Sequence, residues 1–105
     1  MKGLEGCESF DRLEERESKV SSDPITCEGP IDSLYNNAPE QIDFAVGGGN
    51  EVKITGRGWP DAVVWTPWTD MEACYKEFVC VENAVAAEEV VVAPGDTWSA
   101  STRLE

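Results

Sequence analysis

A strict alternation of apolar and polar side chains in the middle of the chain limits its fold more than any other feature. In Gln41–Val46 and again in Glu51–Thr55, the even-numbered residues are large and apolar. This spacing places the apolar side chains of each segment on one face of an extended strand. The intervening Gly47–Asn50 supplies residues that tolerate the positive φ of a tight turn. The sequence therefore predicts a β-hairpin with one buried face.

Further short apolar segments, separated by turn residues, follow along the chain. We expect a short helical turn at Thr69–Lys76, where Thr69 precedes Glu72 with the spacing of a helix cap. About six to eight short strands with frequent turn signals are typical of a β-sandwich. The expected fold class is therefore all-β, a partial β-sandwich. The further predicted strands are Ala62–Trp65, Phe78–Glu82, Val90–Ala93 and Trp98–Leu104.

The first quarter of the chain differs in composition from the remainder. Asp11–Lys19 is charged almost throughout and has no apolar stripe on which a helix could dock, and Ser21–Pro24 marks a break. A length of 105 residues fits one domain. We therefore expect residues 1–24 to be a charged, loop-like segment and residues 25–105 to carry the sandwich.

The charge balance excludes several classes of partner. Twenty-one acidic and 8 basic residues give a net charge of −13. Nucleic acids and anionic membranes both require a concentrated cationic surface, so we expect neither as a partner. No apolar run approaches a membrane span of ~20 residues, and Met1–Phe10 lacks the apolar core of a secretory signal. We expect a cytoplasmic protein, or a plastid one if a targeting segment lies upstream.

The chain lacks the residues of the common metal and cofactor motifs. It contains no histidine, and none of its four cysteines forms a C-x2-C pair, so zinc patterns are absent. The glycine-rich nucleotide motifs are absent too. We expect no cofactor, no metal site, and reduced thiols at every cysteine. Any catalysis must use carboxylates, thiols, hydroxyls or amines. The cysteines are Cys7, Cys27, Cys74 and Cys80.

Two tryptophans form the first candidate site. Trp65 and Trp68 flank Thr66 and Pro67, and the proline restrains the backbone of this segment. Their flat rings could pack against the C–H face of a sugar. The alternative is that both rings belong to the core, because tryptophan is on average highly buried.

Two carboxylates form the second candidate site. Glu82 ends the apolar run from Phe78, where partial desolvation would favour its use as a proton acceptor; the alternative is a solvated glutamate at the end of a strand. Asp32 lies where a turn leads into a strand, and its carboxylate could accept hydrogen bonds from sugar hydroxyls. The alternative for Asp32 is a turn residue that bonds its own backbone.

Together these segments resemble the hexose-6-phosphate mutarotases, also called glucose-6-phosphate 1-epimerases, of the galactose mutarotase-like superfamily. The likeness covers nearly the whole chain and the C-terminal portion of the family's domain. It implies part of a large twisted β-sandwich. The matching segments, in the family's order, are Gly3–Gly6, Ile31–Tyr35, Asp61–Trp68, Tyr75–Glu82 and Ala93–Trp98.

The resemblance also implies an isomerase that interconverts the α and β anomers of a hexose 6-phosphate. In that family a glutamate removes the proton of the C1 hydroxyl and a histidine protonates the ring oxygen. Glu82 matches the base, and Asp32 matches an aspartate that contacts the sugar, with Trp65 and Trp68 as further candidates for substrate binding. The histidine has no counterpart here. The alternative is a catalytically incompetent remnant that binds carbohydrate or self-associates through exposed strand edges.

Overall fold

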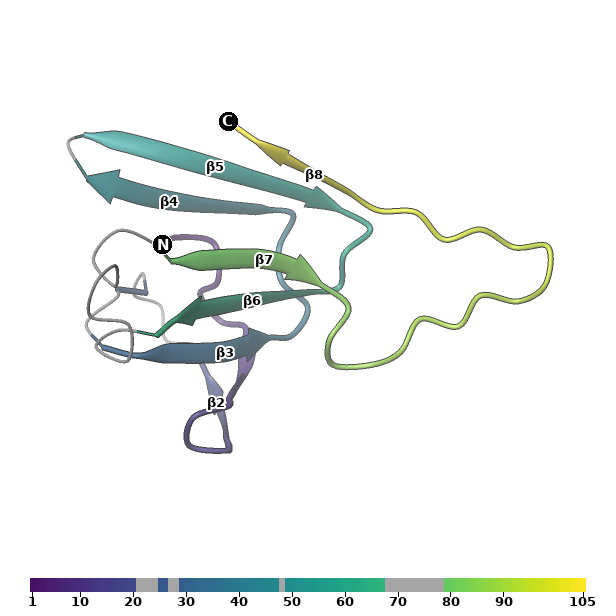
Figure 1. The fold of residues 1–105 in the computed structure, drawn as a ribbon, viewed down its shortest axis with the longest axis horizontal. Coiled ribbons are helices and arrows are strands. Elements are labelled where there is room, and N and C mark those ends of the chain that lie inside the picture. Colours follow the sequence, from purple (N-terminus) through teal and green to yellow (C-terminus); the bar gives the residue numbers. More distant parts are fainter. Residues whose placement is uncertain (21–24, 27–28, 48, 68–78) are drawn as a thin grey trace.

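A computed structural model describes residues 1–20, 25–26, 29–47, 49–67 and 79–105. Every regular element in these ranges is a β-strand (Figure 1). The described residues accordingly include no helix long and apolar enough to cross a membrane. The strands are β1 (Glu8–Asp11), β2 (Arg16–Lys19), β3 (Ile31–Tyr35), β4 (Gln41–Gly47), β5 (Asn50–Arg57), β6 (Asp61–Thr66), β7 (Cys80–Ala84) and β8 (Ser101–Leu104).

The strands form two antiparallel sheets. One sheet has five strands in the order β2-β1-β3-β6-β7, and the other has three in the order β4-β5-β8. Figure 1 shows the two sheets as separate layers, with β4, β5 and β8 above β7, β6 and β3. This architecture confirms the predicted all-β, partial β-sandwich.

The central hairpin forms as the alternating pattern predicts. Strands β4 and β5 pair with Ile42 opposite Ile54, and Gly47 opposite Asn50 closes the turn. Gly49 adopts a φ of 79°, a conformation that side chains other than glycine's rarely tolerate. On the predicted apolar face, Ile42 and Ile54 are 1% and 6% exposed, and Phe44 and Val52 are half-buried.

The core lies between the two layers. Strand β6 contributes Ala62 and Val64, which alternate with residues that point away from the core. At one end, Asn83 of β7 packs so closely over Gly56 of β5 that a Cβ on Gly56 would lie 2.6 Å from the Asn83 amide nitrogen. Asn83 also accepts a hydrogen bond of 2.9 Å from the Thr102 hydroxyl of β8. The buried apolar residues are Leu4, Tyr35, Ile42, Ile54, Ala62 and Val64.

The charged N-terminal segment differs from the loop that its composition predicted. Glu8–Asp11 and Arg16–Lys19 pair as a hairpin, and β1 continues into the sheet by pairing with β3. All four residues of β2 are exposed. A strand at the edge of a sheet needs backbone pairing on one side only, and charged side chains suit such a position. The lack of an apolar stripe therefore excluded a helix without excluding a strand.

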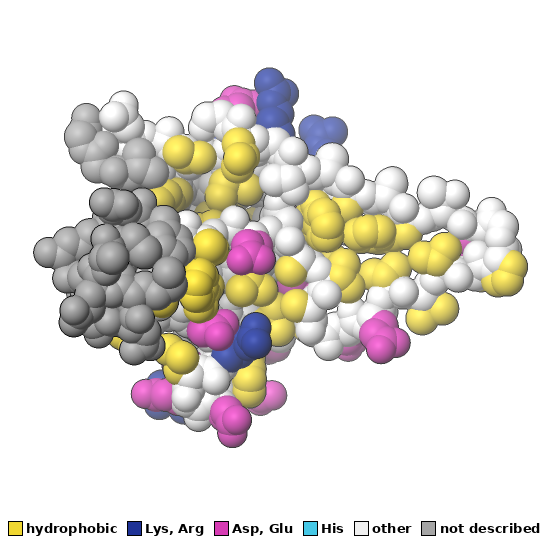
Figure 2. All heavy atoms as spheres, viewed as in Figure 1, with side chains coloured by type: hydrophobic (Ala, Val, Ile, Leu, Met, Phe, Trp, Pro, Cys, Tyr) yellow, Lys and Arg dark blue, Asp and Glu magenta, His cyan; other side chains and the backbone are white. Residues whose placement is uncertain are grey.

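The segment between β7 and β8 also departs from the prediction. Val90–Ala93, expected as a strand, is not paired, and Val91 is 88% exposed. Residues 85–100 extend from the sandwich as an arm, drawn in green and yellow in Figure 1, and Figure 2 shows apolar side chains along it. The final strand starts at Ser101, where the Trp59 indole N–H donates to the Ser101 carbonyl at 3.1 Å. The helical turn expected at Thr69–Lys76 lies outside the described residues.

The fold predicts that the N-terminal segment contributes to stability through Leu4. This side chain is fully buried, so Leu4→Ala should lower the free energy of unfolding by about 2–5 kcal/mol. Leu13→Ala is the matched control, because Leu13 is 55% exposed and its loss should change stability by less than about 0.5 kcal/mol. Urea unfolding of both variants measures the difference. Equal effects would contradict the placement of this segment in the sandwich.

Candidate functional site

The pairing of β3, β6 and β7 places the candidate residues on one face. Asp32 lies opposite Trp65, and Trp65 lies opposite Cys80. In the neighbouring row Leu34 lies opposite Val63, and Val63 lies opposite Glu82. Paired residues point to the same side of a sheet, as do residues two apart along a strand. These two rows form what we call the outer face: Asp32, Leu34, Val63, Trp65, Cys80 and Glu82.

The outer face is opposite to the core. Tyr35, Ala62 and Val64, which alternate with the outer-face residues along β3 and β6, are buried between the two sheets. The middle strand of the outer face, β6, contributes the apolar Val63 and Trp65, and the acidic Asp32 and Glu82 lie on the strands to either side. Its side chains are partly or fully accessible.

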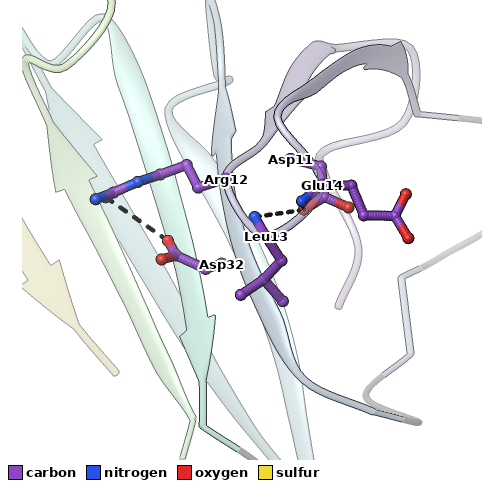
Figure 3. A network of polar contacts seen from close by, with 5 residues as sticks. All are labelled: Asp11, Arg12, Leu13, Glu14 and Asp32. Atoms are coloured by element: carbon purple, nitrogen blue, oxygen red, sulfur yellow. Dashed lines mark hydrogen bonds and ion pairs between the residues drawn. The ribbon is translucent and has the colours of Figure 1, made fainter.

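Asp32 is the second residue of β3, and its side chain is 23% exposed. Asp32 forms an ion pair with Arg12, whose Nη1 lies 3.6 Å from Asp32 Oδ1 (Figure 3). The backbone joins the same two residues, because the Arg12 N–H donates to the Asp32 carbonyl at 2.8 Å. Asp32 therefore sits in a strand rather than in a turn that bonds its own backbone, and its carboxylate points to the outer face.

Trp65 occupies the centre of its row. It lies between Asp32 of β3 and Cys80 of β7, and it is half-buried rather than part of the core. A half-buried aromatic ring combines an apolar surface with partial accessibility. Trp68, the other tryptophan of this candidate site, lies outside the described residues.

Glu82 differs from its predicted setting. It lies in the middle of β7 rather than at the end of a strand, and it is exposed. The expected desolvation is absent because β7 is the outermost strand of its sheet in the described part of the chain. Glu82 is two strands and two residues away from Asp32, which corresponds to about 12 Å between their Cα atoms. The two carboxylates can therefore approach a small molecule from opposite sides.

The pKa of the Cys80 thiol responds to the charge of Glu82 on the outer face. Burial, and then the nearby Glu82 carboxylate, raise the pKa of the Cys80 thiol above its ordinary value. Cys7 lies elsewhere, and its pKa is raised by burial and by Glu5. Both are free cysteines. The Glu82 charge is thus close enough to Cys80 to oppose formation of a thiolate there.

Asp61 is a residue of this region that the sequence analysis did not identify as a site. It is 3% exposed, and its Oδ2 accepts hydrogen bonds from the backbone N–H groups of Ala86 at 3.1 Å and Ala87 at 3.0 Å. These bonds fix the chain where it leaves β7, and so support the strand that carries Glu82. Its two partners lie far along the chain, so local spacing gave no signal of this role.

An open hollow of about 400 Å³ lies away from the outer face. None of the described candidate residues, Asp32, Trp65 and Glu82, lines it. Across the part of the chain that the structure describes, no group of three or more Cys, Asp or Glu residues is arranged to hold a metal ion. The hollow is lined by Gly3, Glu5, Gly6, Cys7, Glu8, Asn36, Asn37 and Pro39.

Comparison with known proteins shows similarity to one protein family and to a curated relative. The family model described as aldose 1-epimerase matches residues 3–105. A protein of Cenchrus ciliaris named "Putative glucose-6-phosphate 1-epimerase" is 33% identical over 111 aligned positions, which cover 90% of this chain and 33% of the relative. The chain thus spans about one third of the length of that curated relative. No solved structure matches.

The site geometry predicts that Glu82 controls the reactivity of Cys80. Glu82→Gln removes the like charge that helps to raise the pKa of Cys80, so that pKa should fall toward its ordinary value. The thiolate is the reactive form, and alkylation of Cys80 by iodoacetamide at pH 8 should therefore become faster. Site-resolved mass spectrometry measures each rate separately. Cys7 is the internal control and should be unaffected, since Glu5 is the charge acting on it. An unchanged rate at Cys80 would contradict the proximity of the two side chains.

Proposed function

Because this chain belongs to the aldose 1-epimerase family, we propose that its outer face binds a hexose 6-phosphate and interconverts the α and β anomers. The observation that carries the proposal is the register that places Asp32, Trp65 and Glu82 on one face. The name of the Cenchrus relative supports the choice of glucose 6-phosphate as the sugar. The chain spans about one third of that relative, so the activity of the whole protein is itself part of the proposal.

The outer face supplies two kinds of contact for a sugar. The Trp65 ring, together with Leu34 and Val63, offers an apolar surface for the C–H groups of a pyranose ring. The Asp32 carboxylate accepts hydrogen bonds from sugar hydroxyls, which act as the donors. We place the pyranose ring of the sugar between Asp32 and Glu82, with its C1 hydroxyl toward Glu82.

Glu82 acts as the general base. Its carboxylate takes the proton of the C1 hydroxyl, the bond between C1 and the ring oxygen breaks, and that electron pair passes to the ring oxygen while C1 becomes an aldehyde. The ring oxygen takes up a proton, and the C1–C2 bond rotates. The new hydroxyl then attacks the opposite face of the aldehyde and gives up its proton, while Glu82 returns its proton to the C1 oxygen. These 105 residues contain no histidine, so water or another acidic group supplies the proton to the ring oxygen.

A second candidate function is carbohydrate binding without turnover. The exposure of Glu82 and the lack of a histidine acid favour it. A single member of an acid/base pair gives little acceleration. Both functions use the same contacts at Asp32 and Trp65, so they differ only in the rate of anomer exchange.

Anomer exchange of glucose 6-phosphate, followed by NMR magnetisation transfer between the two C1 protons, tests the proposal. The chain should accelerate exchange over buffer, and Glu82→Gln should remove that acceleration, since an acid/base group typically contributes about 10²–10⁴ in rate. Glu51→Gln is the matched control. It makes the same chemical change at an exposed residue of β5 in the other sheet, and should leave the rate unchanged.

Two outcomes separate the alternatives. Exchange at the buffer rate, with sugar signals still broadened by the protein, would support binding without turnover. Acceleration that survives Glu82→Gln would exclude Glu82 as the base.

A further inference from the structure

We infer that Arg12 is a positioning residue of the outer face: its guanidinium holds the Asp32 carboxylate in place for a sugar hydroxyl. The inference rests on the proposed function of this face. It adds a residue from the charged hairpin at the N-terminus, which the sequence analysis assigned to a loop, to the residues of β3, β6 and β7.

The backbone brings Arg12 to Asp32. The register of β1 and β3 places Phe10 opposite Leu34 and Asp11 opposite Ser33. Arg12 continues this register by one residue, because its N–H donates to the Asp32 carbonyl at 2.8 Å. Residues opposite each other in a sheet point to the same side, so the Arg12 side chain projects over the outer face beside Asp32.

A short turn holds Arg12 from the other side. The Asp11 carboxylate accepts hydrogen bonds from the backbone N–H groups of Leu13 at 2.9 Å and Glu14 at 3.2 Å (Figure 3). Glu15 then adopts a φ of 52°, in the left-handed region, which turns the chain into β2. The backbone on both sides of Arg12 is thus fixed, and less freedom is lost when its side chain contacts Asp32.

The ion pair suits a role in positioning. Arg12 approaches Asp32 through Oδ1, at 3.6 Å, and we assign Oδ2 to the sugar hydroxyl. The Arg12 side chain is 59% exposed, so the pair adds little to the stability of the fold. Its effect should appear in sugar binding, where a carboxylate held in one orientation loses less entropy than a free one.

The hairpin provides a matched control. Arg16 carries the same charge in the same hairpin, but it pairs with Glu14 at 3.2 Å and makes no ion pair with Asp32. Arg12→Gln and Arg16→Gln therefore change the net charge equally, but only Arg12→Gln removes the ion pair with Asp32.

The test is titration of the full chain with glucose 6-phosphate, with Kd taken from NMR line shapes. Arg12→Gln should weaken binding about twofold to fivefold, the range expected for an exposed ion pair. Arg12→Lys should restore most of the affinity, and Arg16→Gln should bind like the unmodified chain. In an Asp32→Asn background, Arg12→Gln should add no further loss, because the two residues act as one unit.

Each other outcome overturns a defined part of the inference. Unchanged affinity of Arg12→Gln, with weaker binding by Asp32→Asn, would remove the role of Arg12 and leave the proposed function intact. An equal loss from Arg12→Gln with and without Asp32 would show that Arg12 contacts the sugar itself, which contradicts a positioning role. No binding by the unmodified chain would reject the proposed function and this inference together. Thermal unfolding of every variant verifies folding, and if Arg12→Gln does not fold, Arg12→Ala in the same cycle decides the question.

Discussion

The antiparallel register of β3, β6 and β7 determines which side chains lie in the core and which lie on the outer face. Side chains alternate along a strand, so a slip of one residue would move Asp32 and Trp65 into the core and bring Ala62 and Val64 to the outside. Burial of Ala62 and Val64 against the second sheet prevents that slip. The contacts that form the core therefore also determine which side chains face outward, and stability and site geometry share one cause.

The sequence predicted those parts of the fold whose signal is local. The alternation in Gln41–Val46 and Glu51–Thr55, with glycines between them, contains all that is needed for the β4–β5 hairpin. Non-local features were missed. Arg16–Lys19 forms a strand because β1 lies beside it, whereas Val90–Ala93, with better strand-forming residues, has no strand paired with it among the described residues. Whether each of these two segments forms a strand depends on a neighbouring strand to pair with, and not on its own strand-forming residues.

For the candidate site, too, the sequence indicated individual residues but not the contacts between distant strands. The sequence proposed Asp32, Trp65 and Glu82 as candidates, but it did not indicate that Glu82 lies exposed in the middle of β7, the outermost strand of its sheet among the described residues. It also did not identify Arg12, because only the pairing of β1 with β3 shows that this residue meets Asp32. In a chain with a net charge of −13, the Arg12 cation offsets the charge of the Asp32 carboxylate with which it pairs.

The central claim is that the outer face of β3, β6 and β7 is the surface that meets the sugar. The most direct measurement is a two-dimensional ¹H–¹⁵N NMR titration of the uniformly labelled chain with glucose 6-phosphate. We expect the largest chemical-shift changes at the amides of β3, β6 and β7 and at the Trp65 indole, and little change in β4, β5 and β8. Changes confined to β4, β5 and β8, or to the hollow that Glu5 and Asn36 line, would contradict it.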